Sequence, residues 1–225
     1  MKQLLLIVTL GVVLFAACKK DSDSAIPSTQ SNFKFFNGVP GAVFGVKLDT
    51  VTVSSGVNYG EATAYKSMRA QSYNLTIING NQQLALGQFF LRNGKNFTLF
   101  LGADTSGKLL TYVWAEDDLS AVPGDSARWR VVDLSDSYKT NNRSALPLDF
   151  RMDTTRVFRA VVFGGITKYA NIFAPSNYTL NVNYVDSSKV MGSFPTGFLK
   201  GKSYTYVATG NANTTNFQVF QVQNN

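Results

Sequence analysis

From Phe33 onward the chain alternates short apolar runs with polar breaks. Runs rich in Val, Phe, Tyr and Thr recur about every ten residues, and Gly, Asn, Asp and Pro separate them. Within Tyr204–Ala208 the side chains alternate between an aromatic and a mixed face, which is the period of a half-buried strand. No long stretch shows a helical period. The pattern therefore predicts an all-β protein.

The predicted strands fall into two series. In the first half they are Phe33–Phe36, Val43–Leu48, Tyr73–Ile78, Phe97–Leu101 and Leu110–Trp114. In the second half they are Arg130–Val132, Leu148–Met152, Val157–Phe163, Tyr178–Tyr184, Tyr204–Ala208 and Phe217–Val222. Asn79-Gly80 predicts a hairpin turn, because both residues tolerate positive φ. Gly94-Lys95 and Gly201-Lys202 predict a further hairpin turn at one place in each series.

The two series are similar in sequence. YGEATAY at 59–65 matches FGGITKY at 163–169 without a gap, and VKLD at 46–49 corresponds to FRMD at 150–153. Phe33 corresponds to Trp129, and Phe90-Leu91 corresponds to Phe198-Leu199. Because the matches are collinear, we expect two homologous domains, at 33–120 and 127–225. Their density of short strands is typical of immunoglobulin-like sandwiches in tandem.

Turn-forming residues separate the domains, and one insertion distinguishes them. The boundary lies in LSAVPGDSA at 119–127, where Pro, Gly and Asp interrupt the strand pattern. The second domain has an additional polar loop, SYKTNNRS at 137–144. Loops on rigid sandwiches often make contacts, so this loop supplies the candidate contact residues Tyr138, Asn141, Asn142 and Arg143. We expect Tyr138 to be exposed.

The N-terminal segment has the anatomy of an export signal. Lys2 precedes an apolar run from Leu4 to Phe15, and Ala16 and Ala17 stand before the single cysteine, Cys18. The run is too short to span a bilayer. We therefore predict a signal peptide at 1–17 and a flexible, polar tether at 18–32.

The cysteine after two small residues resembles the lipobox of bacterial lipoproteins. The resemblance implies that Cys18 carries the lipid anchor, with Phe15 in place of the more usual Leu three residues earlier. KKDSD at 19–23 resembles the signals that send Bacteroidetes lipoproteins to the cell surface, and an ordinary solvated linker is the alternative reading. We expect a protein anchored in the outer membrane, with the surface favoured over the periplasmic face.

The amino-acid composition limits which catalytic groups, metal sites and partners the protein can have. The chain has 21 Lys and Arg against 14 Asp and Glu, a net charge of +7, and no histidine. Scattered basic residues favour a solvated mixed surface rather than a nucleic-acid partner. Without histidine or a free thiol, Ser-His-Asp and Cys-His catalysis and the usual zinc, copper and iron sites are excluded. We expect no catalytic residue, no cofactor and no metal.

Two functions remain to be considered: a hydrolase that uses carboxylates, and sugar binding by aromatic side chains. A glycan hydrolase with paired carboxylates would draw on the acidic residues Glu116, Asp117, Asp118, Asp133, Asp136, Asp149 and Asp153, which we expect to be solvated turn residues. Exposed aromatic rings could contact sugars, and the candidates are Tyr112, Trp114, Trp129 and Tyr138. Most aromatic residues are expected in the two cores, Trp129 among them.

The folded part resembles a known family. The strand endings VKLD and FRMD, followed by Y-G-x-x-T-x-Y and A-x-S-Y-x-L, are similar to the DUF4397 domain of exported bacterial proteins. That resemblance implies tandem β-sandwiches without an established activity. We expect a non-catalytic binding or structural module with glycan or envelope-protein partners. Asp-Ser-Ala at Ser24 and at Ser126 resembles the O-glycosylation sites of Bacteroidetes.

Overall fold

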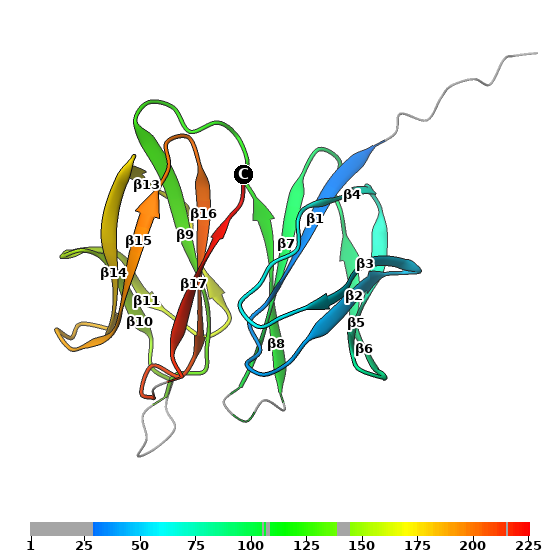
Figure 1. Cartoon of the computed structure of the whole chain (residues 1–225), viewed down its shortest axis with the longest axis horizontal. Helices are drawn as coiled ribbons and strands as arrows, with labels where there is room; N and C mark the ends of the chain where they lie inside the picture. Colours follow the sequence, from blue (N-terminus) through cyan, green and yellow to red (C-terminus); the bar gives the residue numbers. More distant parts are fainter. Residues whose placement is uncertain (1–28, 105, 107–108, 139–144, 215) are drawn as a thin grey trace, which may run out of the picture.

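The protein folds as two β-sandwiches side by side (Figure 1). The computed structural model describes residues 29–104, 106, 109–138, 145–214 and 216–225. These residues form seventeen strands and, within the described ranges, no helix. The prediction of an all-β protein is confirmed.

Domain 1, as we call strands β1 to β8, consists of two four-stranded sheets. The first has the order β4-β1-β7-β8 and the second the order β3-β2-β5-β6. The strands are β1 (Gln30–Asn37), β2 (Phe44–Leu48), β3 (Val51–Val57), β4 (Lys66–Arg69), β5 (Ser72–Asn79), β6 (Gln82–Phe90), β7 (Asn96–Ala103) and β8 (Leu110–Asp117). Strand β1 pairs with β7 in parallel, and all the other pairs are antiparallel.

Domain 2, strands β9 to β17, repeats this arrangement. Its sheets have the orders β12-β9-β16-β17 and β11-β10-β14-β15, with β13 also paired to β9. The strands are β9 (Ser126–Ser135), β10 (Leu148–Met152), β11 (Thr155–Val161), β12 (Gly165–Ile166), β13 (Ala170–Phe173), β14 (Ser176–Tyr184), β15 (Val190–Phe198), β16 (Ser203–Gly210) and β17 (Gln218–Gln223). Strand β13 takes the place of β4, and β12 corresponds to the isolated bridge between Phe36 and Ala62.

The internal repeat extends to single hydrogen bonds. Asp49 and Asp153 both have positive φ, and each carboxylate accepts a backbone N–H from the neighbouring strand. The Thr63 hydroxyl accepts the N–H of Phe35, and Thr167 does the same for Val131. Equivalent residues therefore have equivalent roles in both domains.

Two sequence expectations about turns and strands need correction. Gly94 and Gly201 have positive φ, but each lies on a connection that crosses from one sheet to the other and is not a hairpin. The Asn79-Gly80 hairpin is present, joining β5 to β6. Strand β1 begins at Gln30, inside the segment expected to be tether, because its N-terminal residues pair with β4.

Strand β1 is buried on both faces, unlike a strand at the surface of a single sandwich. Phe35 belongs to the core of domain 1, whereas its neighbour Phe36 belongs to a separate cluster between the domains. That interdomain cluster joins strands of both halves and contains Phe36, Phe100, Val113, Ala115, Val132, Leu134, Val207 and Val222, with Phe220 packed against it. The sheet β4-β1-β7-β8 thus packs against its counterpart in domain 2.

Charged side chains extend this interface with near two-fold symmetry. Lys34 of domain 1 donates through Nζ to the carbonyl of Gln223 in domain 2, at 3.0 Å. Its counterpart Arg130 donates to the carbonyl of Glu116 in domain 1, at 2.9 Å, and pairs with the Asp117 carboxylate. Side chains that reach into the opposite domain from both sides hold the two sandwiches in one relative orientation.

Asp117 is the centre of the polar network. Its carboxylate accepts the hydroxyl protons of Tyr65, at 2.7 Å, and of Thr98, at 2.6 Å, besides pairing with Arg130. Burial lowers the pKa of Lys34, which the Asp117 charge partly opposes. Burial and the Asp117 charge raise the pKa of Tyr65, so this phenol remains a hydrogen-bond donor.

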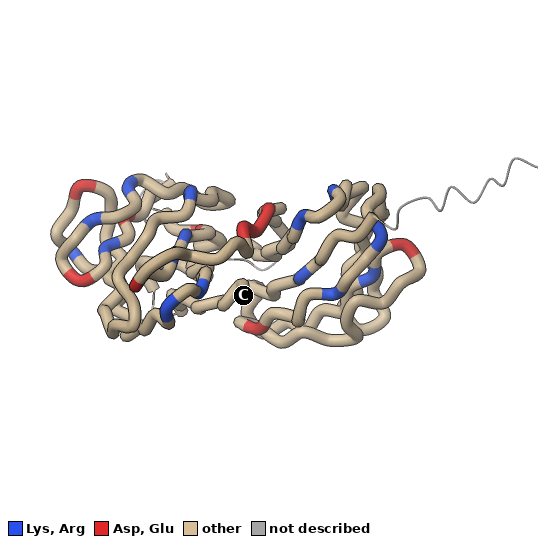
Figure 2. The backbone as a smooth tube through the Cα atoms, turned by 90° about the horizontal axis from the view of Figure 1, so that it is seen from above, with Lys and Arg blue, Asp and Glu red and all other residues tan. Residues whose placement is uncertain are grey.

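The expectation that the charges form a solvated surface is therefore wrong for this group. Lys and Arg are distributed over both domains, and an acidic segment lies between them (Figure 2). Lys34, Arg130 and Asp117 are each exposed by 5% or less. They are buried because a second domain covers the outer face of the first sheet, which no local pattern of residues reveals.

Candidate functional site: a cleft at one edge of domain 1

Most of the candidate site residues lie outside the described part of the chain. These are Cys18, Ser24, Asn141, Asn142 and Arg143. Tyr138 is described, and the expectation that it is exposed is wrong. It is half-buried, it forms a β-bridge with Ala145, and its carbonyl accepts a hydrogen bond from Asn213. The base of the inserted loop is thereby attached to the β16–β17 connection.

The candidate carboxylates are occupied in structural roles. Asp117, Asp133 and Asp149 are buried, contrary to the expectation of solvated turns. Asp149 accepts the N–H of Ala160, at 2.9 Å, and lies 3.3 Å from Arg156. Glu116 pairs with Arg92 and Lys95. Asp118 pairs with Arg128. Asp153 accepts the N–H of Thr179. These contacts arise from strand pairing and the domain interface rather than from a catalytic cleft.

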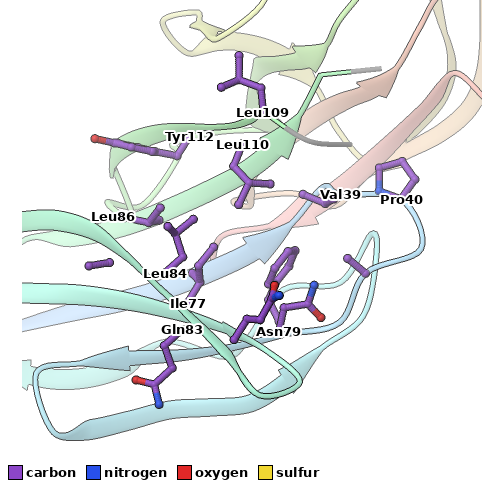
Figure 3. Close-up of a pocket in the computed structure, with 14 residues that line it drawn as sticks. Val39, Pro40, Ile77, Asn79, Gln83, Leu84, Leu86, Leu109, Leu110 and Tyr112 are labelled. Carbon is purple, nitrogen blue, oxygen red and sulfur yellow. The ribbon is translucent and has the colours of Figure 1, made fainter. Parts of the chain in front are cut away.

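A wide opening lies between the edge strands β6 and β8 of domain 1. These strands end the two sheets of the sandwich on the same side, and the space between them has a volume of about 840 Å³. The residues that the structure describes in this lining carry no charge. They are Val39, Pro40, Ala42, Phe44, Ile77, Asn79, Gln82, Gln83, Leu84, Ala85, Leu86, Leu109, Leu110 and Tyr112. In Figure 3, Leu84 and Leu86 lie across the gap from Leu110.

Aromatic rings close the rest of this edge. Trp114 on β8 stacks on Phe97, with ring centroids 5.0 Å apart, and lies 4.8 Å from Phe89 on β6. Phe89 in turn contacts Tyr112 at 5.4 Å. The cleft begins where this stack ends, at Tyr112, because leucines are too short to meet across the two sheets.

Domain 2 fills the corresponding opening. Phe194 on β15 and Phe217, which directly precedes β17, lie with their rings 5.9 Å apart. The strand registers place Leu110 of domain 1 at the position of Phe217. The cleft is therefore not a requirement of the fold, and the difference between the domains comes from the size of a few side chains.

Strand β6 also presents a backbone edge, with a β-bulge at Leu86 in its pairing with β5. It is the last strand of its sheet, and its sequence, QQLALGQFF, contains no charge and no proline. Edge strands usually carry charged residues or proline, which prevent pairing with other chains. Leu84 is 47% exposed and Phe90 is 57% exposed. An apolar side wall and a free strand edge thus lie together.

The described residues show no alternative built around a metal or a membrane helix. Within the placed ranges, His, Cys, Asp and Glu do not gather in groups of three that could hold a metal ion. Among the same residues, none of the structure forms a helix long and apolar enough to cross a bilayer.

The comparisons with known proteins identify the family. A model described as "Domain of unknown function (DUF4397)" matches residues 23–140, which is more than half of the chain. The chain belongs to the DUF4397 family. The DUF4397 match covers all of domain 1 and strand β9 of domain 2. No curated protein matches the sequence.

Among solved structures, one similar chain is the CBM26 module CBMbc of Amy13K from Eubacterium rectale, crystallised with maltoheptaose. The identity is 10%, the alignment covers 86% of this DUF4397 protein and 97% of that module, and the TM-score is 0.30.

Sequence reasoning identifies only part of this site. Tyr112 is among the candidate sugar-contacting residues, and it lines the cleft. Trp129, by contrast, is fully buried in the core of domain 2, as expected. Leu84 and Leu86 are missed because the pattern predicts no strand at β6. The absence of charged residues from QQLALGQFF is visible in the sequence, but the edge position of the strand is not.

Proposed function

We propose that this protein is a non-catalytic binding module, anchored to the outer membrane through Cys18 and displayed at the cell surface. The signal peptide and the cysteine after two alanines support the anchor. The observation that carries the binding role is the uncharged cleft between β6 and β8. An apolar cleft with a few polar groups at its rim is typical of a binding site.

The cleft lies at the end of domain 1 opposite the start of strand β1. Strand β1 runs from the tether toward Asn37, and Val39 and Pro40, which line the cleft, follow at its far end. The β5–β6 hairpin and the segment after β1 thus share the end of domain 1 opposite Gln30, where β1 begins (Figure 1). This position suits an anchored protein that meets a partner away from its own membrane.

We propose that the partner is an extended, apolar segment of another envelope protein. The free edge of β6 can pair with such a strand through backbone hydrogen bonds, while its side chains fill the cleft. A charged partner would meet no counter-charge among the described residues of this lining. The interdomain network supports the same role, because a fixed pair of domains loses little conformational entropy on binding.

A carboxylate-dependent hydrolase is the competing function. It requires two carboxyl groups that flank one scissile bond. No Asp or Glu is among the residues described as lining the cleft, and the carboxylates above are held by arginines and backbone N–H groups. These observations favour binding over catalysis.

The test uses the full-length protein in intact cells, with a photocrosslinking residue in place of Tyr112. Leu84→Lys puts a charge on the β6 edge and should abolish a protein adduct. Val51→Lys is the matched control, since Val51 lies on β3, the opposite edge of the same sheet, and is 39% exposed. It should leave the adduct unchanged.

Other outcomes would refute the proposal. A crosslink that survives Leu84→Lys, or that Val51→Lys removes equally, would place the contact elsewhere. A lipid or glycan adduct would exclude a protein partner. The anchor is tested separately: Cys18→Ser should release the protein from the membrane fraction, and retention there would exclude lipidation at Cys18.

A further inference from the structure

Two equivalent loops lie at the end of the protein where strand β1 begins. In the β6–β7 connection, the Gly94 N–H donates to the carbonyl of Gln30, the first residue of β1, at 2.7 Å. In the β15–β16 connection, the Gly201 N–H donates to the carbonyl of Ser126, the first residue of β9, at 2.8 Å. Each domain therefore places the same loop beside the start of its first strand.

The domain interface brings both loops to one end of the molecule. Arg130, near the start of β9, donates to the carbonyl of Glu116, near the end of β8. The end of β8 lies beside the start of β7, with Asp117 in register with Asn96, and β7 runs parallel to β1. Strands β1 and β9 thus start at the same end of the pair of domains (Figure 1).

Both loops carry exposed basic side chains. The β6–β7 loop contains Arg92 and Lys95, and the β15–β16 loop contains Lys200 and Lys202. The side chains of Arg92, Lys95 and Lys200 are each exposed by 50% or more. Arg69, the last residue of β4, adds an exposed cation beside the start of β1. A basic surface therefore extends over this end of both domains.

The carboxylates near these loops do not balance the cations. Among the described residues of the loops, the adjoining strand ends and the 118–125 linker, Glu116, Asp118 and Asp125 each pair with at least one Lys or Arg. Six basic side chains, counting Arg128, therefore lie with three carboxylates, apart from the buried Asp117 pair. Exposed ion pairs are weak because water and salt screen them, so these cations remain available to other anions.

Exposed apolar side chains accompany the charges. Leu199, in the β15–β16 loop, is 58% exposed. Phe90, the last residue of β6, is 57% exposed, and Phe173, the last residue of β13, is 61% exposed. No other phenylalanine that the structure describes is exposed to this extent. Apolar side chains next to Lys and Arg are typical of a surface that lies at a membrane interface.

The opposite end of the molecule has a different charge. The β5–β6 turn at 79–82 is uncharged, and the β14–β15 turn at 186–189 holds one Asp and one Lys. The basic loops are therefore a property of one end rather than of the whole surface.

The predicted anchor joins the protein at the basic end. Cys18 lies twelve residues before Gln30, the first residue of β1. A chain of that length reaches at most about 40 Å when fully extended. A lipid on Cys18 therefore keeps this end close to the membrane surface, where anionic head groups attract Lys and Arg.

We propose that this end of both domains docks on the lipid surface that holds the anchor, an inference that rests on the proposed lipidation of Cys18. The Lys and Arg side chains of the two loops contact anionic head groups. Leu199, Phe90 and Phe173 contact the boundary between head groups and acyl chains. The cleft between β6 and β8 then opens away from the membrane, toward a partner.

The test uses the lipidated full-length protein in vesicles of phosphatidylcholine and phosphatidylglycerol whose acyl chains carry bromine. A nitrobenzoxadiazole label on Leu199→Cys should be quenched by the bromine, because it reaches the acyl-chain boundary. The same label on Leu109→Cys should not be quenched, since Leu109 is 68% exposed and directly precedes β8 at the opposite end. Vesicles of phosphatidylcholine alone should quench neither label.

Charge reversal tests whether the two loops dock together. Lys95→Glu, in domain 1, should lower the ratio of quenched to unquenched label at position 199 of domain 2 about tenfold, because it removes an attractive charge and adds a repulsive one. Lys189→Glu is the matched control, since it makes the same change of charge in the β14–β15 turn at the opposite end. It should leave the ratio unchanged.

Several outcomes would overturn the proposal. These are an unquenched label at position 199, equal quenching at positions 109 and 199, equal quenching without phosphatidylglycerol, and equal effects of Lys95→Glu and Lys189→Glu. The mass of the N-terminal peptide reports the anchor separately. A lipidated peptide with an unquenched label rejects the docking alone, whereas an unmodified Cys18 rejects the anchor and with it the docking. The crosslink at Tyr112 tests the cleft independently of both.

Discussion

Asp133 is a carboxylate at a position where the fold favours an amide. Its counterpart in domain 1 is Asn37, and both side chains are fully buried. Asn37 Oδ1 accepts the N–H of Val39, while Nδ2 donates to the carbonyls of Ala42, at 2.8 Å, and Val57, at 2.9 Å. Both the oxygen and the nitrogen of the Asn37 amide therefore have hydrogen-bond partners.

In domain 2 only one of the two polar atoms at this position has hydrogen-bond partners. Asp133 Oδ1 accepts the N–H and the hydroxyl of Ser135, at 2.8 and 2.6 Å. Oδ2 is buried without a partner among the described residues. Burial raises the pKa of Asp133 from 3.8 to about 7, although the bonds from Ser135 act to lower it.

This raised pKa makes the free energy of unfolding depend on pH. Between pH 3.8 and about 7 the unfolded carboxyl is ionised while the folded one is still protonated. Folding then takes up a proton, so stability falls as the pH rises through this interval. At about 1.4 kcal/mol for each pH unit, the loss reaches about 4 kcal/mol above pH 7.

The substitution Asp133→Asn supplies the amide found in domain 1 and removes the titrating group. We expect the variant to be more stable than the wild type, by a margin that grows by about 2–3 kcal/mol from pH 5 to pH 8. Urea unfolding at both pH values measures it, with Trp129 as the fluorescent probe of domain 2 in a Trp114→Phe background. The difference between the two proteins cancels the titration of all other groups.

The reciprocal substitution is the control. Asn37→Asp places a carboxylate against two carbonyl oxygens and should give domain 1 the same loss of stability with rising pH. A stability difference between wild type and Asp133→Asn that is equal at pH 5 and pH 8 would refute the reasoning, since a neutral buried carboxyl group would then not exist.

Two further predictions concern the domain interface. Arg130→Met leaves Asp117 buried without its cation and should cost about 3–5 kcal/mol in urea unfolding; a loss below about 1 kcal/mol would show that the pair is not needed. Gly60 and Gly164 both have positive φ, but a Cβ at Gly60 would overlap the Phe220 ring, whereas nothing lies within 4 Å at Gly164. Gly60→Ala should therefore cost about 1–3 kcal/mol more than Gly164→Ala, and equal costs would argue against the packed interface.

Features that depend on neighbours along the chain are predicted well from the sequence. The predicted strand Tyr73–Ile78 is present within β5, where Tyr73, Leu75 and Ile77 are buried. Strand β10 has the predicted bounds, Leu148–Met152. Strand β6 is missed because its central residues are exposed at a sheet edge, so its apolar residues do not alternate with polar ones.

Charged residues are the main source of error. The pattern places Lys34, Arg130 and Asp117 at the surface, because charged side chains are almost never fully buried unless they are paired. Their partners lie in the other domain, between 13 and 189 positions away in the sequence for the contacts described. A local pattern contains no information about such partners.

The strand type, the two-fold repeat and the residues that share a face all follow from the sequence, because a strand has a period of two and a repeat leaves collinear matches. What covers each face depends on the folded molecule alone. Phe35 and Phe36 look alike in sequence, yet one packs in the core and the other against the second domain. Likewise Leu110 borders an open cleft where Phe217 closes one, because the fit between two sheets depends on side chains brought together from separate strands.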